Sequence, residues 1–320
     1  MESSRKSGWQ PTEPLFQEDP TADVILRSTD GADFRAHKLM LSIASPLFRD
    51  MFSVGGASNS MPARHDMQPP DDRVVPMTEE RAEVVEKLLR LCYPVKGPRW
   101  ENAAELHPVL MAAIKYQLEG VVETLRRELV APRFLESEPL RVFAIACHAK
   151  FTNDARVAAR HALSHPILLE EAPTELSSIT AFSLYRFLQF RDKCSKAAAE
   201  LTTDSSDSSC MGWVPDCDCD WVWFKCQKHS WRPRSVRFDE YVVKWWRTYL
   251  SSARAALTQN PSGSSATREE TLKAALEEAS TCSNCSSKAY MDLTRFSRRL
   301  ADAVDRKVNE IANTFDFCEA

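Results

Sequence analysis

Residues 23–52 have the sequence DVILRSTDGADFRAHKLMLSIASPLFRDMF, and this stretch decides the fold of the first part of the chain. Its apolar residues 24–26 predict a short buried strand. Asp30-Gly31 follows and is the strongest hairpin signal in the chain, because these residue types tolerate the backbone of a tight turn. A second strand is therefore expected around Phe34.

The second half of this stretch has helical periodicity. Its apolar residues lie four positions apart, and a Ser-Pro pair interrupts them. We expect two short helices, the second beginning at Pro46, because proline suits the first position of a helix. The residues four apart are Leu39, Ile43, Leu47 and Met51, with Phe48 and Phe52 beside them. The simplest interpretation places Phe48, Met51 and Phe52 in the core.

Similar signals organise the rest of the chain. The polar residues 55–72 are expected to form an exposed loop, and residues 73–77 a short edge strand. Thr78 is expected to cap a helix that ends before Tyr93-Pro94. Further helices are expected over residues 102–117, 119–130, 138–151, 154–164, 174–201, 238–258 and 267–316. Linkers are expected at the sequences TTDSSDSS (202–209) and QNPSGSSA (259–266).

Composition excludes several classes of protein. The chain has 320 residues and 43% hydrophobic content, enough for a core in each of about two domains. A net charge of -4 argues against a globally basic nucleic-acid binder, so nucleic acid is not an expected partner. The first residues lack an apolar signal core, and no uncharged apolar run approaches the ~20 residues of a membrane span. We therefore expect a cytoplasmic or nuclear protein with no membrane partner.

Motifs of the common enzyme classes do not occur in the sequence. It contains no G-x-S-x-G, P-loop, H-E-x-x-H or dinucleotide-binding fingerprint. Only 8 glycines are present, which also argues against glycine-rich phosphate loops. We expect no enzymatic activity and assign no catalytic residue.

The stretch at 23–52 resembles the start of BTB/POZ domains. The resemblance is carried by an Asp before the first strand, a Phe-x-Ala-His-Lys hinge at 34–38, and a Ser-x-x-Phe-x-x-Met-Phe pattern at 45–52. It covers roughly residues 20–131. The resemblance implies a small β-sheet flanked by a helical cluster, and the chain as a whole resembles BTB proteins of mushroom-type fungi, which often carry a helical, Cys-containing C-terminal half.

The resemblance also implies what the chain does. BTB domains associate with themselves or with other BTB domains, and many members dock on a cullin ubiquitin-ligase scaffold. We expect a protein-interaction module without catalysis. Two alternatives stay open: a substrate adaptor of a cullin ligase, and a DNA-associated transcriptional regulator that uses the Cys-rich part. The C-x₂-C…H-x₃₋₅-H spacing of zinc fingers is absent, which disfavours the second.

These signals give an α+β fold, with an N-terminal BTB/POZ fold followed by a mainly α-helical half. The expected domain organisation is a flexible arm (1–19), a BTB/POZ domain (20–131), a helical extension similar to a BACK segment (132–201), a linker (202–209) and a helical Cys-rich module (210–320).

Four residues are candidates for contact with a partner. Leu15 and Phe16 form an apolar pair in the polar arm, which packs either on a partner subunit, as BTB arms do, or on its own domain. Asp23 and Lys38 match two charged BTB positions near the dimer groove. They are expected either to select the partner or to form a structural charge pair.

The cysteines after residue 209 predict a structural zinc site. Cys226-Gln-Lys-His229 has C-x-x-H spacing and Cys282-Ser-Asn-Cys285 has C-x-x-C spacing, and two such pairs supply the four tetrahedral ligands of zinc. Thiolate with imidazole favours zinc over magnesium or calcium. Cys217 or Cys219 is an alternative for one ligand, and reduced thiols with incidental spacing are the competing interpretation.

Tryptophans crowd the same region. They lie at positions 213, 221, 223, 231, 245 and 246. The favoured interpretation is that they pack around the cysteines, and the alternative is a peptide-binding surface.

Overall fold

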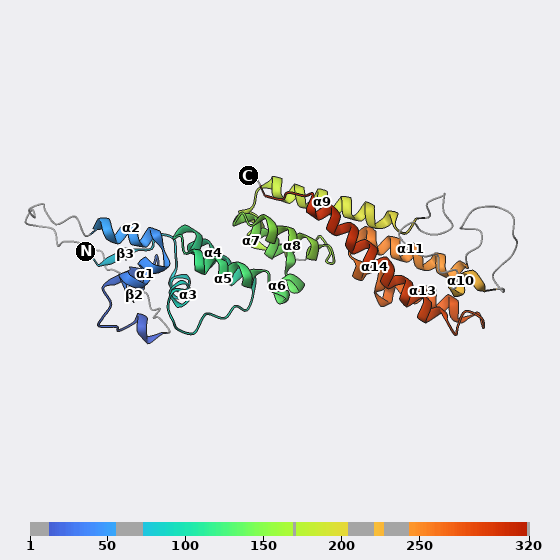
Figure 1. The fold of residues 1–320 in the computed structure, drawn as a ribbon, viewed down its shortest axis with the longest axis horizontal. Coiled ribbons are helices and arrows are strands. Elements are labelled where there is room, and N and C mark those ends of the chain that lie inside the picture. The colour runs from blue at the N-terminus through green and yellow to red at the C-terminus, as the bar shows by residue number, and fades with distance from the viewer. Residues whose placement is uncertain (1–12, 56–72, 169–170, 204–220, 227–242, 319–320) are drawn as a thin grey trace, which may run out of the picture. The chain divides into compact units, whose positions relative to one another are not determined.

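The computed structural model describes residues 13–55, 73–168, 171–203, 221–226 and 243–318. The chain divides into two compact units, Met1–Phe134 and Leu135–Ala320. The described strands all belong to the first unit, whereas the described elements of the second are helices. The predicted α+β class is therefore confirmed (Figure 1).

The first unit contains a three-stranded sheet. Its strands are β1 (Val24–Arg27), β2 (Asp33–Ala36) and β3 (Val74–Pro76), in the order β2-β1-β3. β1 pairs antiparallel with β2, with Leu26 opposite Phe34, and parallel with the edge strand β3. Gly31 has a φ of 83° in the turn, which a glycine adopts without strain. The predicted strand, hairpin and edge strand are confirmed.

Helices cover this sheet and complete the core of the first unit. Leu26, Phe34, Phe48 and Leu88 are buried there. The helices are η1 (Pro14–Phe16, a 3₁₀ turn), α1 (Lys38–Ala44), α2 (Pro46–Gly55), α3 (Ala82–Cys92), α4 (Ala103–Lys115) and α5 (Glu119–Leu129). The break before Pro46 and the end of α3 before Tyr93 are as predicted.

The start of α3 differs from the prediction. The helix begins at Ala82, not at Thr78. Glu80 turns inward instead, where its backbone oxygen accepts a hydrogen bond from the Thr29 N–H. The carboxylate of Asp30 then accepts the Ala82 N–H at 3.0 Å, so the hairpin turn caps the first turn of α3. The residues around Thr78 give no indication of this distant hydrogen-bond partner, so the local sequence placed the start of the helix too early.

The second unit is a helical assembly, preceded by α6 (Pro132–Ser137) at the boundary. Within it α7 packs on α8, α11 packs on α13, and the long α14 packs on α8, α9 and α12. The elements are α7 (Pro139–His148), α8 (Thr152–Ala162), η2 (Thr174–Ser178), α9 (Ala181–Glu200), α10 (Val222–Lys225), α11 (Lys244–Gln259), α12 (Gly263–Thr267), α13 (Glu269–Ser280) and α14 (Ala289–Asn313).

The residues after α14 return to the core of the second unit. Phe317 is fully buried, and its ring contacts those of Phe143 and Phe190 edge-on at centroid distances of 5.6 and 5.3 Å. Arg186 Nε donates to the Asp316 carbonyl at 3.0 Å. The chain after α14 is thereby anchored against α7 and α9.

The predicted linker at 259–266 is wrong, because this stretch contains the buried helix α12. The Gly263 N–H donates to Asp305 Oδ1 of α14 at 2.8 Å, and Ser265 is fully buried. A Cβ at Gly263 would lie 2.6 Å from the Ala301 carbonyl oxygen, so the small residues allow a close approach to α14. Small residues are typical of linkers, but here they let α12 pack closely on α14.

The other predicted loops lie mostly outside the described residues. These are residues 56–72 and 204–209. Thr202, at the start of the predicted linker 202–209, is described and buried. Among the described residues, no helix is both long enough and apolar enough to cross a membrane.

Candidate functional site

An apolar stripe on α1 and α2 is exposed in the first unit. Leu39, Ile43 and Val54 are 69%, 68% and 72% exposed. Leu47 and Met51 are exposed to a smaller degree, and α1 packs against α2. These five residues form what we call the α1–α2 stripe. Isolated exposed apolar residues are ordinary, but five on two packed helices indicate an interaction surface.

The α1–α2 stripe corrects the expectation that Met51 lies in the core. The sequence analysis did not predict that this stripe is an exposed surface. Met51 does not lie in the core, whereas Phe48 does and stacks on Tyr116 at a centroid distance of 5.3 Å. Phe48 is 2% exposed and Met51 is 38% exposed, so Met51 lies at the margin of the buried face of α2. The signal was present in α1, which has apolar residues on more than one face, and a helix on a domain surface buries only one.

Asp23 fixes the start of α1. Its Oδ1 accepts the backbone N–H of Lys38 at 2.7 Å, and a carboxylate at this end of a helix also complements the helix dipole. Lys38 Nζ lies 5.7 Å from the centroid of the Phe52 ring. The hydrogen bond therefore involves the backbone of Lys38, and Asp23 has a structural role. Selection of a partner by these two residues stays a prediction.

His37 forms the hinge between β2 and α1. Its backbone N–H donates to Tyr93 Oη at 2.7 Å, its Nδ1 lies 3.2 Å from the same oxygen, and its Nε2 lies 2.9 Å from Thr21 Oγ1. Burial raises the pKa of Tyr93 to about 12, so the hydroxyl stays neutral near pH 7. The hinge is thus held by hydrogen bonds, which orients α1 and its half of the stripe.

Phe16 packs inside its own unit. It is fully buried and meets the ring of Tyr93 edge-on at a centroid distance of 5.3 Å. Of the two arrangements expected for the arm, Phe16 adopts the one in which it packs on its own domain. The expectation that Phe16 contacts a partner is therefore corrected, because its ring is buried against Tyr93 beside the hinge. The side chain of Leu15 lies outside the described residues.

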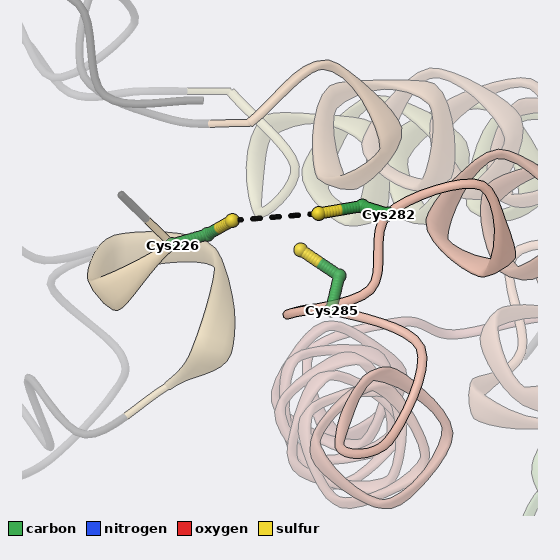
Figure 2. A group of neighbouring side chains, drawn as sticks. All are labelled: Cys226, Cys282 and Cys285. Atoms are coloured by element: carbon green, nitrogen blue, oxygen red, sulfur yellow. Dashed lines mark hydrogen bonds between the residues drawn. The ribbon is translucent and has the colours of Figure 1, made fainter. Parts of the chain in front are cut away.

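The structure brings together three of the predicted metal ligands. Cys226 follows α10, while Cys282 and Cys285 lie between α13 and α14, and the three thiols point toward one another (Figure 2). The Sγ atoms all lie within 4.8 Å of one another, and those of Cys226 and Cys282 are 3.7 Å apart. All three residues are buried. The group, called the cysteine cluster below, can hold a metal ion.

The remaining predicted ligands cannot be placed. His229 and the alternates Cys217 and Cys219 lie outside the described residues. Their roles stay predictions.

Two thiols of the cluster have opposite shifts in pKa. Burial opposes ionisation of Cys282, but backbone hydrogen bonds from Cys285 and Asn284 and side-chain hydrogen bonds from the other two cysteines hold its pKa below the usual value. Burial raises the pKa of Cys285 to about 12. One thiol is therefore prepared for ionisation.

The tryptophans that precede Cys226 pack on aromatic rings of α11 and α14. Trp221 stacks on Trp223 at 4.8 Å, and Trp223 stacks on Trp246 at 5.7 Å. The edge of Phe296 on α14 meets Trp223 at 5.6 Å. The described tryptophans of this group are buried, which confirms packing rather than a peptide-binding surface for them. Trp213 and Trp231 lie outside the described residues.

Comparison with known proteins identifies the first unit. The family model described as "BTB/POZ domain" matches residues 12–132, which include the sheet, the hinge and the α1–α2 stripe. These residues form a BTB/POZ domain. The BTB family is a non-catalytic family of interaction domains, which indicates that this part of the chain is a protein-interaction module.

Two mouse proteins are similar to the chain. TD and POZ domain-containing protein 2 from Mus musculus is 28% identical over 182 residues, covering 52% of this chain and 46% of that protein. TD and POZ domain-containing protein 5 from Mus musculus is 26% identical over 155 residues, covering 43% of this chain and 42% of that protein. The chain thus spans less than half the length of these relatives. The resemblance to fungal BTB proteins stays a prediction.

Proposed function

We propose that the BTB domain makes the chain self-associate through the α1–α2 stripe. The observation that carries the proposal is the exposure of Leu39, Ile43 and Val54, each by about two thirds or more. A second copy of the chain suits this surface because a two-fold interface joins one patch to an identical patch. All five residues of the stripe are uncharged, so two copies meet without like-charge repulsion.

The stripe is also held in position before association. Asp23 caps α1, and the His37–Tyr93 hydrogen bonds fix the hinge that precedes it. Preorganised helices lose little conformational freedom when they bind, which favours association. The residues expected to set partner choice, Asp23 and Lys38, thus lie beside the start of the stripe.

Light scattering during size-exclusion chromatography tests the proposal. At ~10 μM the full chain is expected to have twice the mass of one copy, since standard interfaces of this kind reach micromolar affinity or better. Combining Leu39→Asp with Ile43→Asp buries two charges in the interface and should give a single-copy mass. Leu168→Asp, at a residue that is 86% exposed in the second unit, is the matched control and should stay dimeric. A single-copy mass for the unmodified chain at this concentration rules the proposal out.

A substrate adaptor of a cullin ligase is the second candidate. The helices α6, α7 and α8 follow the BTB domain directly, as the helical extension of an adaptor would. Co-purification of the chain with a cullin N-terminal domain supports this role. Its failure, with the dimer intact, leaves self-association as the function.

A DNA-associated regulator is the weaker alternative. The described tryptophans of the second unit and the three cysteines of the cluster are buried, which disfavours contact with a nucleic acid. Retention on DNA-cellulose that falls steeply with salt would support it. A location in the cytoplasm, the nucleus or both is part of the same proposal.

A further inference from the structure

The cysteine cluster joins segments that are distant in sequence. Cys226 and Cys282 are 56 positions apart, yet their sulfurs lie 3.7 Å from each other. The third thiol, Cys285, is fully buried beside them. Three buried thiols from two distant segments therefore lie side by side, an arrangement that a shared ligand would explain (Figure 2).

The spacing of the Cys226 and Cys282 sulfurs fits a tetrahedral zinc ion, and the Cys285 sulfur lies within 4.8 Å of both. With Zn–S bonds of ~2.3 Å, two ligands of a tetrahedral ion have sulfurs about 3.8 Å apart. The Cys226–Cys282 distance of 3.7 Å is close to that value. A disulfide needs about 2.05 Å, so these two residues are not bonded to each other.

The backbone around Cys282 is folded as a ligand turn. The N–H groups of Cys285 and Ser286 donate to the Cys282 carbonyl at 3.1 and 2.8 Å, which closes a tight turn over the C-x-x-C sequence. This turn brings the thiols of Cys282 and Cys285 to the same side.

We propose that Cys226, Cys282 and Cys285 bind a structural zinc ion as thiolates. Each thiol releases one proton to solvent as its Zn–S bond forms, and a fourth donor from outside this trio completes the tetrahedron. All three ligands are buried, which is typical of a structural rather than a catalytic ion. The ion goes beyond the proposed association, because it lies in the second unit.

The zinc ion has a mechanical consequence for α10. This helix has only four residues, too few to be stable alone. The Val222 N–H donates to Asp292 Oδ2 at 2.9 Å, and Trp221 meets the edge of Phe296 at 6.1 Å. The Zn–Cys226 bond therefore adds an anchor at the end of a short segment whose Trp223 packs on Trp245 and Trp246 of α11 and on Phe296 of α14.

Metal analysis of the full chain, purified under reducing conditions without chelators, tests the site. About one equivalent of zinc is expected, and Cys226→Ser or Cys282→Ser should each reduce it to roughly a tenth or less. Cys318→Ser changes a half-buried cysteine outside the cluster and should keep the zinc. Zinc content below about a tenth of an equivalent in the unmodified protein overturns the proposal, as does a disulfide within the trio.

Cobalt provides a readout that does not depend on the stability of the variants. Adding Co²⁺ to metal-depleted full chain should give the strong visible absorption of tetrahedral cobalt with a sulfur-to-metal charge-transfer band. Addition of zinc should remove both bands. Only weak octahedral cobalt absorption, in a protein with reduced thiols, would contradict the site.

Discussion

Glu80 is a buried charge that connects three segments of the BTB domain. Its carboxylate accepts hydrogen bonds from Lys115 Nζ at 2.9 Å and from Tyr116 Oη at 2.8 Å. Burial alone would raise the pKa of Glu80, but these hydrogen bonds outweigh it and hold the pKa below the usual value. Such a charge stabilises only while it is ionised.

Glu80→Gln is expected to lower the free energy of unfolding of the BTB domain at pH 7 by about 1–3 kcal/mol, because the ion pair is lost. The pKa of the folded state is depressed, so this contribution is complete above the unfolded pKa of ~4.3 and disappears as the pH falls through the folded pKa. Scanning calorimetry at pH 7 and about pH 3 measures both values. An equal deficit at the two pH values would contradict this assignment.

Asp23→Ala removes the carboxylate that caps α1, which is expected to cost about 0.5–2 kcal/mol. Asp23→Asn is the matched control. It should lose only a small fraction of the stability that Asp23→Ala loses, because Asn caps nearly as well as Asp. Chemical denaturation followed by circular dichroism gives the difference. Equal losses in the two variants would show that the charge matters and the hydrogen bond does not.

At the residue scale, sequence patterns identified candidate metal ligands but did not identify which apolar side chains are exposed. The C-x-x-C and C-x-x-H spacings selected three cysteines that the fold does bring together. The exposure of Leu39 and Ile43 was missed although α1 has apolar residues on more than one face, because periodicity shows that a face is apolar but not what covers it. The cap of α3 by Asp30 was missed because the two are 52 positions apart.

At the scale of elements, α12 shows how a glycine permits close packing. Gly263→Ala is expected to destabilise the second unit by roughly 1–3 kcal/mol, because the new Cβ would meet the Ala301 carbonyl oxygen at 2.6 Å. Gly120→Ala in α5 has open space and should stabilise the chain by about 0.5–1 kcal/mol. Thermal unfolding measures both. The same sign for the two variants would contradict the packing of α12 on α14.

Local signals predicted most elements and failed where a distant partner decides. The strands, the hairpin and the break at Pro46 depend on neighbouring residues and were predicted correctly. The stretch at 259–266 has the composition of a linker, but its environment is supplied by Asp305, 42 positions after Gly263. The amino-acid composition of residues 259–266 does not reveal a hydrogen bond to a residue so far along the chain.

The whole molecule has two cores, and each is expected to respond to its own perturbation. A chelator should lower the melting temperature of the second unit by more than about 5 °C and leave the BTB domain unchanged, because metal binding adds to the stability of the folded state alone. Phe16→Ala should do the reverse, since it removes a fully buried ring of the first unit at a cost of about 3–5 kcal/mol. Calorimetry resolves the two transitions. A chelator that shifts both equally would contradict this independence.

The anchoring of Phe317 against α7 and α9 affects how the protein is made. The Phe315 carbonyl accepts a hydrogen bond from Arg156, 159 positions earlier in the chain. At 5–20 residues per second a ribosome needs roughly 10–30 s to synthesise that interval. Until Phe317 emerges, Phe143 of α7 and Phe190 of α9 lack one of their ring partners, whereas the described strands and helices of the BTB domain are already synthesised.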